Sequence, residues 1–172
     1  MSAPKFTRRH LVALGAASAA AAGLGAGGRV WSWWDRAPGE GFKKLSADEA
    51  EIVDCIAEAI FPPGGTPALS GRDAGASRYL DDVLAEVESP TGDLLRLLLH
   101  ALDDWARLTR LSGWAKLSIE ERGEALQAWS RHESHLIRGA ITGLTIFIST
   151  AYTTHPEVQK AAGWVFPCGY TR

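Results

Sequence analysis

The sequence holds one histidine cluster with the residue types that bind metal ions. His132, Glu133 and His135 lie within four positions, and histidines at i and i+3 can share a helical face. The spacing is neither HExxH nor the Glu-x-x-His of di-iron bundles, and it offers at most three of the four ligands of a structural zinc site. We interpret the cluster as a polar surface junction. The alternative is a stand-alone exported metal-binding protein that uses His132 and His135.

The other groups that could do acid–base or nucleophilic chemistry are scattered. Asp81-Asp82 and Asp103-Asp104 are adjacent carboxylates, and we expect one member of each pair to face solvent. His100 lies near the leucine face of its segment, which favours a packed histidine over a general base. The chain has no Walker motif, no CxxC and no glycine-rich turn after a strand. We therefore expect no catalytic, cofactor-binding or metal-binding residue in this chain.

The N-terminus has the features of an export signal. Arg8 and Arg9 follow Thr7 and precede an apolar run, rich in alanine and glycine, that extends to about Gly28. A basic region followed by an apolar region and small residues is typical of such signals. The adjacent arginines and the low hydrophobicity of the run indicate the twin-arginine type, which carries folded proteins.

The sequence offers two fates for the signal, cleavage or retention. Ala22 and Ala26 are both candidate positions, and neither is sharp. An uncleaved signal anchor is the alternative, with Trp31, Trp33 and Trp34 at the membrane interface. We expect a signal over residues 1–28 and a tryptophan-rich linker over 29–44.

Export would allow the two cysteines to form a disulfide. Cys55 and Cys168 would meet an oxidising compartment, where one disulfide could join the first helix to the C-terminal tail. The alternative is that Cys55 is a small core residue and Cys168 a free thiol.

Composition sets the class of the protein. The chain has 172 residues, 46% of them hydrophobic, and a formal net charge of −2. This is enough apolar material for one folded domain. A mildly acidic chain without a basic stripe is a poor candidate for nucleic-acid binding.

The apolar residues repeat with helical period. Ser46 with Glu49 and Ser118 with Glu121 have the spacing of capping boxes. No long stretch alternates between apolar and polar residues, which is the pattern of a half-buried strand. We expect five main helices: from Ser46 to the Pro62-Pro63 pair, over 74–87, from Thr91 or Asp93 to Leu108, and over 118–132 and 134–153. The β-branched residues of the fifth segment also allow a strand there, but the length of the segment favours a helix.

These elements predict an all-α fold: a single bundle of about five helices over residues 45–172, after the signal and the linker. The third helix is expected to be central to the core. The fifth is apolar almost all round between Ile141 and Ser149, so we expect it to be buried.

Several short motifs resemble one known family. They are Leu45-Ser46-x-x-Glu49, Ala59-Ile60-Phe61-Pro62-Pro63, Thr66-Pro67, Asp73-Ala74-Gly75, Tyr79-Leu80-Asp81, the stretch 151–158, and Gly163-Trp164. Together they resemble the gluconate 2-dehydrogenase subunit 3 family, which includes the gamma subunits of bacterial FAD-dependent glucose and sorbitol dehydrogenases. The similarity covers about residues 45–166. Gly64-Gly65 is a departure, since other members often carry acidic or polar residues there.

The resemblance implies a non-catalytic role. In such proteins the small subunit carries the twin-arginine signal, and the large FAD-containing subunit, of the glucose-methanol-choline oxidoreductase type, is exported while bound to it through the twin-arginine translocase. In many members a cytochrome c subunit takes the electrons and anchors the complex to the membrane. The chain would then be a periplasmic escort and structural subunit. Its interface candidates are the aromatic and proline residues near its ends and in its first loop: Trp31, Trp33, Trp34, Phe61, Pro62, Trp164 and Phe166.

Overall fold

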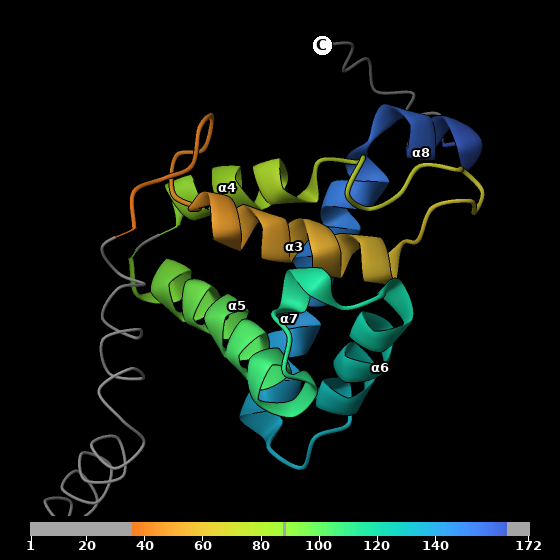
Figure 1. The fold of residues 1–172 in the computed structure, drawn as a ribbon. Helices are drawn as coiled ribbons and strands as arrows, with labels where there is room; N and C mark the ends of the chain where they lie inside the picture. The colour runs from red at the N-terminus through yellow and green to blue at the C-terminus, as the bar shows by residue number, and fades with distance from the viewer. Residues whose placement is uncertain (1–35, 88, 165–172) are drawn as a thin grey trace, which may run out of the picture. The chain divides into compact units, whose positions relative to one another are not determined.

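Helices make up the computed structural model, which describes residues 36–87 and 89–164. The helices are α3 (Ala47–Ile60), α4 (Ala76–Glu86), α5 (Ser89–Arg110), the 3-10 turn η1 (Trp114–Lys116), α6 (Ile119–Ser130), α7 (His135–Thr154) and α8 (Pro156–Ala161) (Figure 1). No strand occurs among these described residues. The expected all-α fold is confirmed, with the short α8 added to the five expected helices.

Both predicted capping boxes are present. In α3 the Ser46 hydroxyl accepts from the Glu49 amide, and the Glu49 carboxylate accepts from the Ser46 amide. Ser118 and Glu121 repeat the arrangement at the start of α6. Each box satisfies two amides that the first helical turn leaves without a helical partner. Local sequence therefore determines where these two helices begin.

The core is built around α3, which packs against α4, α5, α6 and η1 (Figure 1). Val53, Ile56 and Ala57 of α3 have no exposed surface, and neither has Trp114 of η1. The core is closed on the side away from α3 by α7, which contacts α4, α5 and α6. We call these packed helices the helical unit.

The expectations that α5 is central to the core and that α7 is buried between Ile141 and Ser149 are wrong in part. Leu99 and Leu102 of α5 are fully buried, whereas Leu94 is 67% exposed. On α7, Ile148 is buried, whereas Ile146, within the stretch expected to be buried, is 59% exposed. The physical reason is that neighbouring elements cover only one side of each helix: α3 and η1 pack on α5, and α4 and α6 pack on α7. A second apolar face of each helix remains open.

One helix of the described part, α7, is long and apolar enough to cross a membrane by length and composition. The core helix of a folded domain can pass the same test. Ile141, Leu144, Ile148 and Ala151 of α7 are buried against the other helices, so this helix contributes one face to the core.

Candidate partner-binding surface

The most buried charge of the unit is the carboxylate of Glu49 on α3. Its Oε1 accepts from Arg96 Nε at 2.8 Å and from His100 Nε2 at 2.9 Å, and its Oε2 accepts from the Ser46 amide at 2.8 Å. The Glu49 side chain has no exposed surface. The contacts join the first turn of α3 to the middle of α5.

These contacts decide the charge of Glu49. Burial opposes ionisation, but the hydrogen bonds from His100, Arg96 and Ser46 outweigh it and lower the pKa of Glu49 to about 2. The group is a carboxylate at any physiological pH. A carboxylate held this way stabilises the packing of α3 on α5 and is poorly placed to exchange protons with a substrate.

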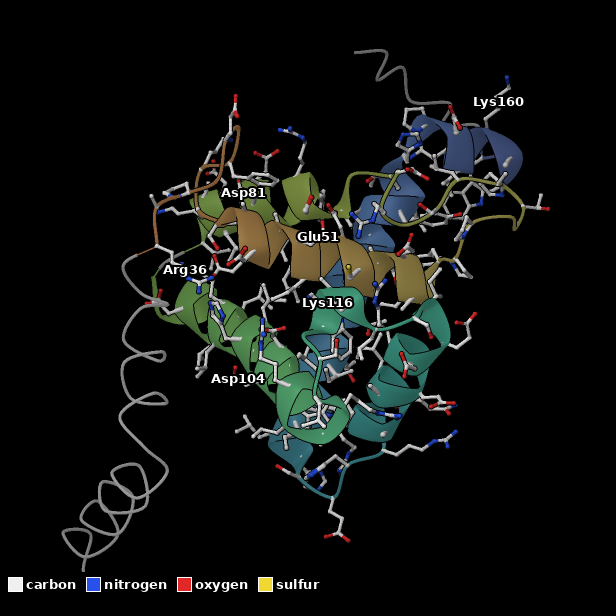
Figure 2. The ribbon with its side chains drawn as sticks, viewed as in Figure 1. Arg36, Glu51, Asp81, Asp104, Lys116 and Lys160 are labelled. Carbon is white, nitrogen blue, oxygen red and sulfur yellow. The ribbon has the colours of Figure 1, made fainter. Side chains whose placement is uncertain are left out.

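The first acid pair divides between interior and surface, as expected. Asp81 of α4 is buried, and its oxygens accept from the amides of Lys43, Lys44 and Leu45 at 2.7–2.8 Å (Figure 2). Its neighbour Asp82 is exposed and pairs with Lys43 Nζ. Asp81 therefore fixes the segment that leads into α3.

In the second pair the division is less complete, because Asp104 is half-buried. Asp103 of α5 is buried and accepts from the amide of Trp114 and from Arg107 Nε, both at 2.8 Å. Its neighbour Asp104 is more exposed. Asp103 thus anchors η1 on α5.

Cys55 is a buried residue of α3 that forms no disulfide within the described part of the chain. Its Sγ lies 3.1 Å from Arg72 Nη2, and that guanidinium also makes two hydrogen bonds, of 2.9 and 3.0 Å, to Glu51. Burial raises the pKa of Cys55 to about 11, so the thiol stays protonated and weakly nucleophilic. Cys168 lies outside the described residues, and the Cys55–Cys168 pairing stays a prediction.

The histidine cluster lies at the exposed junction of α6 and α7. His132 Nδ1 accepts from the Ser134 amide, and the Arg138 guanidinium contacts His135 Nδ1. A guanidinium beside that nitrogen opposes binding of a cation there. Among residues 36–87 and 89–164, no group of three or more His, Cys, Asp or Glu side chains is arranged to hold a metal ion.

Of the interface candidates, Phe61, Pro62 and Trp164 are described. The Phe61 ring stacks on Tyr152 with centroids 4.0 Å apart, and Tyr152 donates to the Leu69 carbonyl at 3.1 Å. Phe61 therefore holds the first loop, which joins α3 to α4, on α7. Only part of its ring is left for a partner. Pro62 is exposed and Trp164 is 52% exposed.

The remaining candidates lie outside the described residues. They are the signal arginines Arg8 and Arg9 and the aromatic residues Trp31, Trp33, Trp34 and Phe166. Their roles stay predictions.

An apolar groove of about 620 Å³ opens between α4, α5 and α7. A volume of this size is in the range of protein binding sites. The lining side chains of α5 and α7 are almost all aliphatic or aromatic, and His135 is the titratable one among them. We call this opening the α5–α7 groove; its walls include Leu94, Leu97, Leu98, Ala101, Leu136, Gly139, Gly143 and Phe147.

Sequence reasoning did not identify the α5–α7 groove. The signal was present, because Leu94, Leu97 and Ala101 on α5 repeat at helical spacing about 120° away from the buried Leu99 and Leu102. Two apolar faces on one helix indicate either complete burial or an open face, and the sequence pattern alone does not distinguish them.

Comparison with known proteins gives one result. A family model described as gluconate 2-dehydrogenase subunit 3 matches residues 47–167. No curated protein and no solved structure matches the chain.

Proposed function

This chain belongs to the gluconate 2-dehydrogenase subunit 3 family, and on that basis we propose that it is a non-catalytic accessory subunit of a periplasmic dehydrogenase complex. Its main partner is a large flavin subunit of the glucose-methanol-choline type, which holds the FAD. The chain binds that subunit, escorts it through the twin-arginine translocase and remains as a structural component of the complex.

The family match is the observation that carries this proposal. It extends from the first residue of α3 past the end of α8, so it covers the whole helical unit and not a single motif. The family is described as a subunit of a dehydrogenase, and a subunit requires a surface for its partner. The α5–α7 groove supplies an apolar surface of suitable size.

The buried charges support an accessory role. Glu49, Asp81 and Asp103 are each held by two or more hydrogen bonds from groups that fix one element on another. Their oxygens position α3, η1 and the segment before α3. These three buried carboxylates therefore have a structural role.

The signal supports the export role. A twin-arginine signal on a small helical subunit is explained if the folded cargo is the flavin subunit bound to it. The complex would then lie in the periplasm and associate with the membrane through the assembly, with a cytochrome c subunit as electron acceptor.

The test is export of the flavin subunit. The chain is co-expressed with its flavin subunit, and flavin-subunit protein is measured in periplasmic and cytoplasmic fractions. Replacing Arg8→Lys together with Arg9→Lys should leave the flavin subunit in the cytoplasm. The control is Arg110→Lys with Arg131→Lys, two exposed arginines of the helical unit, which should leave export unchanged.

Two results would contradict the proposal. Normal export with the lysine pair at 8 and 9 rules out the escort role. Failure of the wild-type chain to copurify with the flavin subunit rules out the subunit role.

A further inference from the structure

We propose that the α5–α7 groove binds a single amphipathic α-helix of the flavin subunit, which lies along α5 and α7 with an acidic end beside the α6–α7 junction. This inference rests on the proposed function, because the helix belongs to the flavin subunit. It adds which surface of this chain is used and what kind of element covers it.

The spacing of the exposed apolar residues selects a helix as the occupant. On α5 the wall includes Leu94, Leu97 and Ala101, at i, i+3 and i+7, with Leu95 and Leu98 beside them at i+1 and i+4. The α7 wall begins at Leu136 and continues at i+3, i+7 and i+11. A repeat of three and four residues is the spacing of a helix that packs along another helix. An extended strand repeats every two residues and would not follow both walls.

The α7 wall has room for close approach. An ideal Cβ built on Gly139 or Gly143 would meet no atom within 4 Å. These two residues are one turn apart on the groove side of α7. Small residues at a helix–helix contact shorten the distance between the axes, so an incoming helix can reach the floor of the groove. Leu136 and Phe147 line the same wall on either side of them.

The exposed leucines give the occupant its chemistry. Leu94 and Leu136 stand mostly in water, although both line the groove. Covering large side chains of this kind is the main favourable term in protein association. The occupant must therefore present an apolar face toward the groove, and a polar face toward solvent if it lies at the surface of the complex.

Charges at the two ends of the groove give the occupant a direction. At the α6–α7 junction, Arg131 and Arg138 outnumber Glu133, and Arg138 donates to the carbonyls of His132 and Glu133. At the α4 end, Glu86 is exposed one residue before the groove-lining Val87. Complementary charge favours an acidic group of the helix at the first end and a basic group at the second.

The experiment fills the groove without disturbing the fold. Gly139→Leu with Gly143→Leu places two side chains in the open space of the α7 wall. The control is Gly123→Leu on α6, where a Cβ also meets no atom within 4 Å and which does not line the groove. Leucine favours helix over glycine, so both variants should fold, and urea unfolding of the full chain checks this.

Binding of the full chain to the purified flavin subunit is then measured by calorimetry. The double variant should bind at least about thirtyfold more weakly, and Gly123→Leu within about twofold of wild type. Hydrogen exchange of the wild-type complex should show protection in α5, in α7 and in one helical segment of the flavin subunit. Arg131→Glu should weaken binding about fivefold at low salt, whereas Lys116→Glu, exposed on η1, should not.

The outcomes separate this inference from the proposed function. If the double leucine variant binds the flavin subunit as tightly as the wild-type chain does, the inference that a helix fills the groove is wrong and the subunit role is unaffected. Absence of any wild-type binding overturns both. Sedimentation of the chain with phosphatidylglycerol vesicles, or a dimer of the chain alone, either of which is lost in the double variant, would assign the groove to lipid or to a second copy and overturn the inference.

Discussion

At the scale of single residues, Glu49 and Glu121 show that the same side chain has different roles in the interior and near the surface. Glu49 and Glu121 occupy the same place in two identical capping boxes. Glu121 accepts from the Ser118 amide near the surface. Glu49 also receives Arg96 and His100 in the interior, so its loss would remove the buried carboxylate that these two side chains share. Removing one member of a buried ion pair is strongly destabilising.

Glu49→Gln should therefore lower the free energy of unfolding by about 3 kcal/mol at pH 7, from the change of its pKa from 4.5 to about 2. Because the folded-state pKa is below the ordinary value, this stability is present above about pH 4.5 and is lost as the pH falls toward 2. Urea unfolding between pH 2 and pH 7 measures it, and the variant should show a smaller change over that window.

Glu121→Gln is the matched control for this prediction. It keeps the same box geometry without buried partners, so it should cost less than about 1 kcal/mol. Equal losses for the two variants would show that Glu49 acts only as a cap.

At the scale of elements, the first loop is fixed to two helices at once. Phe61 stacks on α7, and the Gly71 amide donates to the Phe61 carbonyl at 2.9 Å. At Gly71 the backbone passes so close to α3 that an ideal Cβ would lie 2.2 Å from the carbonyl oxygen of Ala57. The close approach of loop and helix therefore depends on the absence of a side chain.

Gly71→Ala should destabilise the protein by about 2–3 kcal/mol, because loop and α3 must separate to admit the methyl group. Thermal unfolding followed by circular dichroism measures the change. Gly65→Ala in the same loop is the control, since its Cβ would be 3.6 Å from the nearest atom, the Pro67 carbonyl oxygen. A loss at position 65 equal to that at 71 would contradict the explanation.

At the scale of the whole unit, Arg122 connects three segments that are far apart in the sequence. Its guanidinium pairs with Glu58 of α3 at 2.9 Å and donates to the carbonyls of Trp114 and Ala115 at 3.3 and 3.0 Å. The Arg122 side chain is almost fully buried. This one residue of α6 therefore holds η1 against the central helix.

Arg122→Ala should cost about 3 kcal/mol in free energy of unfolding, because it leaves Glu58 and two carbonyls without their donor. Arg110→Ala is the control. Its contact with Glu124 is 3.6 Å long and largely exposed, and exposed pairs contribute about 0–1 kcal/mol. Urea midpoints of the two variants should differ clearly, and similar midpoints would contradict a structural role for Arg122.

The success of sequence reasoning varied with the range of the interactions. It placed both capping boxes and the five main helices, and it expected one member of the Asp81-Asp82 pair to face solvent; the structure shows that this member is Asp82. It expected α7 to be buried between Ile141 and Ser149, whereas Ile146 is exposed. It identified Glu49 only as a cap, and it had no indication of Arg96 as its partner.

The sequence by itself determined the helical segments, their starts, the all-α class and the family, because caps and periodicity arise from residues within a few positions of one another. Only the tertiary structure decided that His100 meets Glu49 from 51 residues away, and that the second apolar faces of α5 and α7 remain open as a groove. Such contacts depend on how helices pack across the core. An apolar helical face has the same sequence pattern whether or not another element covers it.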